Sequence, residues 1–134
     1  MDKLSDMRAV SHDQANKLAA IGISTAAQLL KAGATPEGRR DLVERTGIDK
    51  DHILSFVNYS DLCRIKGISV KYANLLEAAG VDTVKELGKR NATNLHNTLV
   101  ATNAEHGLVK QLPSAGKVES WVSQAKGMER GVHY

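Results

Sequence analysis

The sequence has few cysteine residues, which could cross-link a small domain, and few aromatic residues, which could fill its core. Its single cysteine, Cys63, cannot form an internal disulfide, which fits a reducing compartment. Aromatic residues make up only 4% of the chain, so alanine and leucine must supply most of the core. Such a core favours closely packed helices, and the apolar–polar alternation that is typical of strands is absent. The composition therefore predicts an all-α fold.

Long hydrophobic runs are missing as well. The first ten residues, MDKLSDMRAV, contain no apolar run of signal-peptide length, and no later segment is long enough to span a membrane. With 134 residues, the chain fits one domain or two very small ones and can bury a sizeable core. We therefore expect a soluble, cytoplasmic protein that has no membrane partner.

The patterns that carry catalytic or metal chemistry are also absent. No two of the five histidines form an HxH or HxxxH pair, and Cys63 has no cysteine partner, so we expect no metal site. Ser11, His12 and Asp13 are adjacent and cannot take the mutual geometry of a catalytic triad. No glycine-rich nucleotide-binding loop occurs. We expect no catalytic residues, no cofactor and no enzymatic activity.

What the sequence does contain is an internal repeat. Residues 11–35 and 69–93, at an offset of 58, share 11 of 25 residues, whereas ordinary composition would give roughly two by chance. The shared residues are helix caps, helix-stop glycines and small apolar residues, among them Ser11/Ser69, Ala15/Ala73, Leu18/Leu76, Gly22/Gly80, Leu29/Leu87 and Thr35/Thr93. Two copies indicate pseudo-symmetric halves, because an extended solenoid needs more repeats to be stable.

The repeat predicts a first half over residues 1–58 and a second half over residues 59–134, packed together as one globular unit. Start and stop signals divide these halves into about ten short helices. The expected helices are residues 4–10, a Ser11-capped helix to Ala20, a Ser24-capped helix to about Lys31, a helix opened by Thr35-Pro36, an Asp49-capped helix, a helix around residues 61–65, a Ser69-capped helix to Ala79, an Asp82-capped helix over residues 83–90, a Thr93-capped helix, and a helix opened by Pro113-Ser114.

Charge is unevenly distributed between the two halves. Residues 1–58 carry eight acidic and eight basic residues, whereas residues 59–134 carry seven acidic and ten basic residues. The whole excess of +3 therefore lies in the second half. A weakly positive half permits an anionic partner without requiring one.

The last expected helix carries the only tryptophan. Trp121 has helical spacing with Val118, Val122 and Ala125. We therefore expect Trp121 to anchor the core and not to serve as a stacking platform for a base.

The sharpest motif lies at residues 62–76, LCRIKGISVKYANLL. In the turn, Gly67 can take a backbone shape that bulkier residues cannot, and Ile68 can insert between the two helices. The freed amides of Gly67, Ser69 and Val70 then point outward at a helix N-terminus. Unpaired N–H groups and the helix dipole both favour negative charge there, so the motif predicts an anion site.

Three basic residues surround this turn: Arg64, Lys66 and Lys71. Lys85 and Lys89 could extend a phosphate-binding face, but they are equally typical of solvated residues near a helix C-terminus. A turn of this kind also joins helices in proteins where it binds nothing, so a purely architectural role is an open alternative.

The motif resembles the helix-hairpin-helix superfamily. The match is I-x-G-I-S-x-x-x-A-x-x-L at residues 65–76, followed by A-G-V-x-T-V-x-E-L at residues 79–87. More narrowly, the second half resembles an uncharacterised family of small proteins with paired helix-hairpin-helix units. That likeness includes N-L-H at residues 94–96, L-P-S at 112–114 and V-x-x-W-V-x-x-A-K at 118–126. The resemblance implies an all-α fold of two pseudo-symmetric tandem helix-hairpin-helix halves, and no agreed activity goes with the family.

Helix-hairpin-helix units often bind the DNA backbone through hairpin amides without reading sequence. Together with the local charge, the resemblance implies the nucleic-acid-binding residues Arg64, Lys66, Gly67, Ile68, Ser69 and Lys71. Stronger binders carry a second glycine where Ser69 stands here. In the first copy, Ala9 replaces Gly67 and Asp13 stands at the position of Lys71. At most the second hairpin is therefore expected to bind phosphate.

A protein–protein interaction or scaffold module is the alternative function. A continuous basic face reaching Lys85 and Lys89 would favour DNA or another nucleic acid as the partner. An exposed apolar patch near Tyr59 and Tyr72 would instead favour a protein partner.

Overall fold

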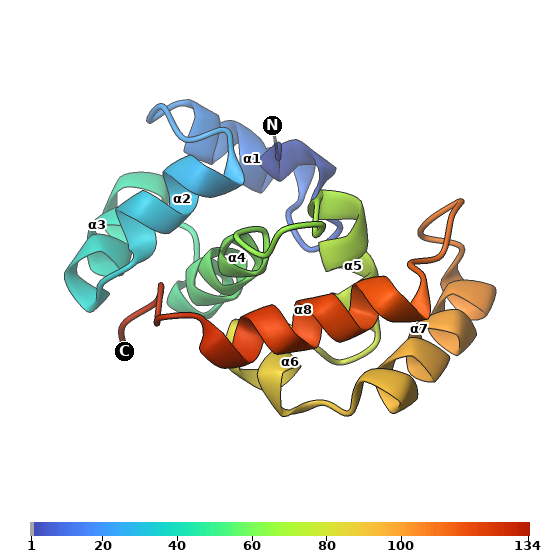
Figure 1. Ribbon diagram of the computed structural model, residues 1–134. Helices are drawn as coiled ribbons and strands as arrows, with labels where there is room; N and C mark the ends of the chain where they lie inside the picture. The colour runs from blue at the N-terminus through green and yellow to red at the C-terminus, as the bar shows by residue number, and fades with distance from the viewer. Residues whose placement is uncertain (1) are drawn as a thin grey trace. The chain divides into compact units, whose positions relative to one another are not determined.

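The computed structural model describes residues 2–134, and every regular element in that range is helical (Figure 1). The elements are the 3₁₀ helix η1 (Leu4–Asp6) and the α-helices α1 (His12–Ala19), α2 (Ala26–Gly33), α3 (Pro36–Thr46), α4 (Lys50–Leu62), α5 (Val70–Ala78), α6 (Val84–Lys89), α7 (Ala92–His106) and α8 (Ala115–Gly127). Residues 2–134 form no strand, and an isolated bridge pairs Lys3 with Thr25. The all-α prediction is confirmed, with eight α-helices and one 3₁₀ helix in this range where about ten helices were expected.

The chain divides into two compact units. Unit 1 comprises Met1–Asp61 together with Arg130–Tyr134, and unit 2 comprises Leu62–Glu129. The boundary expected after residue 58 lies inside α4, and the division in the structure falls near the end of that helix. Unit 2 is therefore one continuous stretch of chain, whereas unit 1 is assembled from two segments.

In unit 1, polar caps set the helix starts that the sequence predicted. Ser11 and Gln14 form a capping box at α1: Gln14 N donates to Ser11 Oγ at 3.1 Å, and Ser11 N donates to Gln14 Oε1 at 2.9 Å. Thr35 Oγ1 accepts from Gly38 N at 3.1 Å, and Pro36 occupies the first turn of α3. α3 packs against α2.

Two expected starts in unit 1 are wrong. Residues 4–10 form only the short helix η1, because the backbone around it is bonded to a distant segment: Leu4 N donates to Ser24 O at 2.9 Å. Thr25, and not Ser24, caps α2, and its Oγ1 accepts from Gln28 N at 3.2 Å. Ser24 N instead donates to Gln28 Oε1 at 2.9 Å, so both neighbours are bonded to one glutamine.

Three expected starts further along the chain are also wrong. Residues 61–65 form no separate helix, because α4 continues to Leu62 and a turn follows. Thr83 caps α6 in place of Asp82, and Asn91 caps α7 in place of Thr93. In both cases two residues able to cap lie close together, and their N-cap preferences do not distinguish them.

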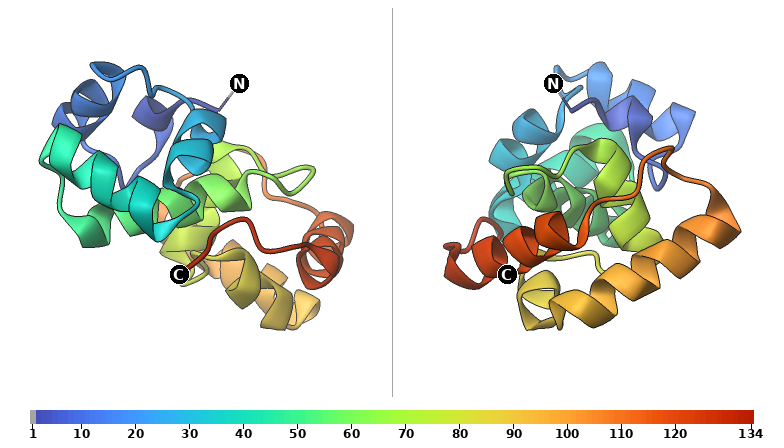
Figure 2. Two further views of the ribbon diagram at one scale, coloured as in Figure 1. Left: turned by 90° about the vertical axis from the view of Figure 1, so that its left-hand side faces the viewer. Right: turned by 45° about the vertical axis from the view of Figure 1, so that its right-hand side comes forward.

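α8 organises the core of unit 2, where it packs against α6 and α7 (Figures 1 and 2). The expected inward residues of α8 are confirmed, and Trp121 is only 1% exposed. Gly88 allows α6 to come close, since a Cβ at that position would lie 3.4 Å from the Ala125 carbonyl carbon. α5 packs against α7. α8 thus gives unit 2 a long helix against which the turn before α5 is held.

Candidate functional site

The turn between α4 and α5 has the shape that the sequence predicted. Gly67 has a φ of 99°, in the left-handed region that favours glycine. Ile68 N donates to Ile65 O at 3.0 Å, and Ile65 N donates to Leu62 O at 3.1 Å. Ile65 and Ile68 are both buried, so Ile68 anchors the turn as expected.

A close contact with α8 adds a second requirement for glycine at position 67. A Cβ built on Gly67 would lie 3.0 Å from Nε1 of Trp121, which is tighter than almost all real contacts of this kind. The Trp121 ring in turn packs against Tyr72 of α5, with the ring centroids 5.3 Å apart. The tryptophan therefore joins the turn, α5 and α8.

Gln124 of α8 holds the peptide groups of Lys66. Lys66 N donates to Gln124 Oε1 at 2.9 Å, and Gln124 Nε2 donates to Lys66 O at 3.1 Å. The same Nε2 also donates to Ser120 Oγ at 3.1 Å. The residue before Gly67 is thus fixed in orientation by a side chain 58 residues away, and the sequence motif contains no signal for this contact.

Replacing Gln124 by alanine should lower the free energy of unfolding of unit 2 by roughly 1–3 kcal/mol, because two backbone bonds of Lys66 lose their partner. We expect Ser123→Ala, an exposed position on the same helix, to change it by less than about 0.5 kcal/mol. Urea denaturation followed by circular dichroism measures both variants. Equal stabilities for the two variants would show that Gln124 does not hold the turn.

The turn presents two backbone amides to solvent. Within residues 2–134, neither Gly67 N nor Ser69 N donates to a protein acceptor, and both residues are exposed. Ser69 occupies the N-cap of α5, but its side chain makes no capping hydrogen bond, contrary to the expected cap. Val70 takes part in an interaction within the chain, so the candidate amides are those of Gly67 and Ser69.

The basic residues predicted around the turn differ in their surroundings. Lys66 and Lys71 are exposed, and neither forms an ion pair with another residue of the described range. Arg64 is also exposed, but its Nη2 donates to Glu129 O at 2.9 Å. The two lysines therefore carry exposed positive charge at the turn that is not held in an ion pair, whereas part of the Arg64 guanidinium is hydrogen-bonded to Glu129 at the end of unit 2.

Tertiary packing adds one cation that the sequence analysis missed. Lys117 of α8 lies with Nζ 5.8 Å from the centroid of the Tyr72 ring. Tyr72 directly follows Lys71, and its hydroxyl donates to Gln111 O at 3.1 Å. Lys117 thus joins the basic group of the turn from a different helix. No spacing in the sequence indicates this, because the contact depends on how α8 packs beside α5.

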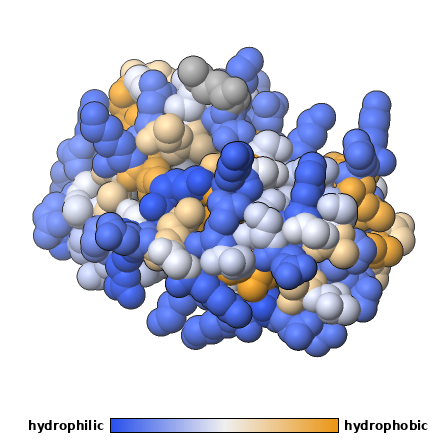
Figure 3. Space-filling view, viewed as in Figure 1, coloured by the Kyte–Doolittle hydropathy of each residue, from blue (hydrophilic) through white to orange (hydrophobic). Residues whose placement is uncertain are grey.

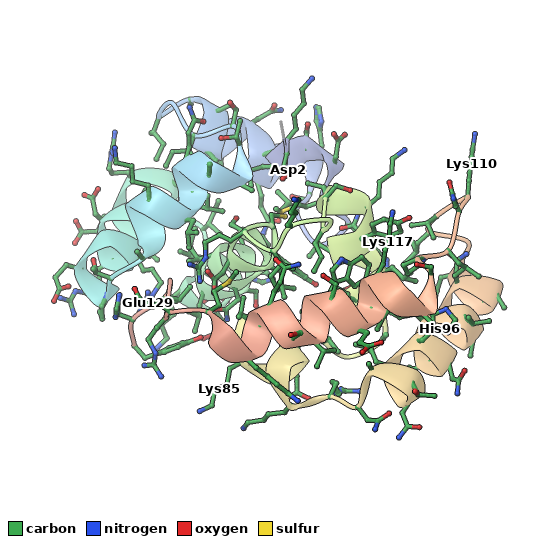
Figure 4. All side chains as sticks on the ribbon, viewed as in Figure 1. Asp2, Lys85, His96, Lys110, Lys117 and Glu129 are labelled. Atoms are coloured by element: carbon green, nitrogen blue, oxygen red, sulfur yellow. The ribbon has the colours of Figure 1, made fainter. Side chains whose placement is uncertain are left out.

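The basic group at the turn does not extend to Lys85. Figure 4 shows Lys85 beside α6 on one side of α8 and Lys117 on the opposite side. Lys89 is exposed on the same short helix as Lys85. The next basic residue, Arg90, is paired with Glu86 at 3.0 Å. The basic group at the turn consists of Lys66, Lys71 and Lys117.

Tyr59 and Tyr72, where an exposed apolar patch would favour a protein partner, are both largely covered. Tyr59 is 5% exposed, and Tyr72 is half-buried between Trp121 and Lys117.

Within residues 2–134, no three His, Cys, Asp or Glu side chains gather in a way that could hold a metal ion. No helix in the described range has both the length and the apolar character needed to cross a membrane.

The comparisons with known proteins place the chain in a family. A family described as a domain of unknown function (DUF4332) matches residues 8–128, which is most of the chain. The chain belongs to this family. No curated protein matches it, and no solved structure matches it. The DUF4332 match confirms the expected membership of an uncharacterised family and names no activity.

Proposed function

We propose that this DUF4332 chain is a non-catalytic helix-hairpin-helix module that binds the nucleic-acid backbone, without sequence specificity, through its second hairpin. One observation carries the proposal: the left-handed turn at Gly67 presents two unbonded amides between the exposed side chains of Lys66 and Lys71. Unpaired amides at the start of a helix favour a phosphate group, and the lysines add positive charge.

The chemistry of these groups explains why no sequence would be read. Backbone amides and lysine ammonium groups contact phosphate oxygens, which are the same at every base pair. The aromatic side chains near the turn are unsuited to base stacking, because Trp121 is buried and Tyr72 is covered by neighbours. The affinity would therefore come from electrostatic attraction to the phosphates, and it would fall as the salt concentration rises.

The distribution of charge between the units supports the same site. Unit 2 carries nine lysine and arginine residues against six acidic residues, whereas unit 1 carries nine of each. The net charge of +3 thus belongs to the unit that contains the Gly67 turn. In the related segment of unit 1, Ala9 stands in place of the turn glycine, so we assign no phosphate site there.

Titration of the whole chain with two duplex DNAs of unrelated sequence tests this function. One hairpin can reach about two to four phosphates, so log affinity should fall against log salt with a slope of about −2 to −4. The two duplexes should bind within a few-fold of each other. Absence of binding at low salt would refute the proposal, and a strong preference for one duplex would refute its sequence independence.

A protein–protein interaction module is the second candidate, favoured by exposed apolar side chains on unit 2. Val100 of α7 is 39% exposed and Leu112, in the segment after α7, is 37% exposed. Figure 3 shows hydrophobic surface at the right-hand edge of the molecule, where α7 and this segment lie. Failure to bind any duplex would favour this second function.

A further inference from the structure

The segment Arg130–Tyr134, here called the strap, is attached to the rest of unit 1 through both backbone groups of one residue. His133 N donates to Ala34 O at 2.7 Å, and Arg39 Nη2 donates to His133 O at 2.6 Å. These bonds join the strap to the end of α2 and to α3. Because they involve only the backbone of His133, they place no demand on its exposed side chain.

Arg39 connects the strap to α2 with a single guanidinium group. Its Nη1 donates to Gly33 O at 2.9 Å while its Nη2 donates to the strap. Carbonyl groups in the last turn of a helix lack intrahelical partners, and a charged donor satisfies them strongly. Arg39 is thus fixed at the end of α2, where its Nη2 can donate to a carbonyl of a neighbouring segment.

The residues on either side of His133 make side-chain contacts. Val132 is buried, with 3% of its surface exposed. The Tyr134 hydroxyl donates to Asn58 Oδ1 at 3.0 Å. The Tyr134 ring lies 5.8 Å from the guanidinium carbon of Arg39 and 5.8 Å from that of Arg130. Unit 1 therefore contacts the side chains of Val132 and Tyr134, whereas it contacts His133 only through the backbone.

We propose that unit 1 carries a peptide-binding site for a Val-x-Tyr segment, and that the strap of a second copy of this chain can occupy it. All the contacts that define the site are made to a short, continuous stretch of chain, so none of them requires the strap to come from the same molecule. Exchange of an identical element between copies is a low-cost route to a dimer. When a chain's own strap occupies the site, it competes with an added peptide at an effective concentration on the order of millimolar, because it is tethered to the same molecule.

A fluorescein-labelled peptide with the sequence of residues 130–134 tests the site. A variant that ends at Glu129 should bind this peptide saturably, as measured by fluorescence anisotropy, and the whole chain should bind it at least tenfold more weakly. In the peptide, His133→Ala should leave affinity unchanged within about twofold, whereas Val132→Asp should abolish binding. Circular dichroism checks that the shortened variant keeps its helices.

A second variant tests the site if the shortened one does not fold. Val132→Ala in the whole chain weakens its own strap while keeping the tether, and it should bind the labelled peptide more tightly than the wild type does. Equal binding by wild type and both variants would overturn the proposal. Equal affinity for the wild-type and Val132→Asp peptides, or no binding to any folded variant, would overturn it as well.

Discussion

Exchanging Lys66 and Lys71 together for glutamate should weaken binding to duplex DNA by about 100-fold at about 0.05 M salt, and reduce the salt slope by about 2. Each lysine near the turn would release about one counterion when it binds a phosphate, whereas each glutamate would repel the phosphate. Both side chains are exposed, so the helical content should stay unchanged. Fluorescence anisotropy at several salt concentrations measures both quantities.

Two control variants separate a local site from general charge. Lys85→Glu with Lys89→Glu makes the same change in net charge on α6, and Lys85 lies on the other side of α8 from Lys117 (Figure 4). We expect that pair, and Arg8→Glu at the position of the first half that corresponds to Lys66, to weaken binding much less. Equal losses from the α6 pair would show that only net charge matters. Equal losses from Arg8→Glu would show that both copies bind.

Replacing Trp121 by alanine should lower the free energy of unfolding of unit 2 by roughly 3–5 kcal/mol, the usual cost of removing a buried large aromatic side chain. Trp121 is 1% exposed and lies against both the Gly67 turn and Tyr72, so the turn and α5 would lose their shared partner on α8. Urea denaturation monitored by circular dichroism gives the change directly.

A conservative variant distinguishes packing from direct contact with a ligand. Trp121→Phe should cost less stability than Trp121→Ala and keep DNA binding at temperatures where the protein is folded. A fully folded Trp121→Phe protein that no longer binds DNA would show that the indole contacts the ligand. A loss below about 1 kcal/mol for Trp121→Ala would show that the core does not depend on it.

The candidate site was predictable where it depends on one short stretch of chain. The Gly67-Ile68 pair between two apolar helix ends indicated a left-handed turn with an inward side chain, and the structure has a positive φ at Gly67 and a buried Ile68. The predicted cap at Ser69 makes no side-chain hydrogen bond, although the residue stands at the expected position. The local sequence thus indicated the path of the backbone at the turn, but it did not indicate whether the Ser69 side chain makes a capping hydrogen bond.

Helix starts show the same limit. Adjacent residues such as Ser24 and Thr25, or Asp82 and Thr83, can each accept a hydrogen bond from the first turn. Local preference does not choose between them, and the structure places Thr25 and Thr83 at the N-caps.

By itself, the sequence determined the helical class and the left-handed positions at Gly22, Gly67 and Gly80, because these depend on composition and on the sterics of single residues. Only the tertiary structure decided that Gln124 holds Lys66, 58 residues away, and that Arg39 holds His133, 94 residues away. Such contacts join side chains whose separation in sequence carries no periodic signal. They exist because helix packing brings distant surfaces together, and packing is a property of the whole unit.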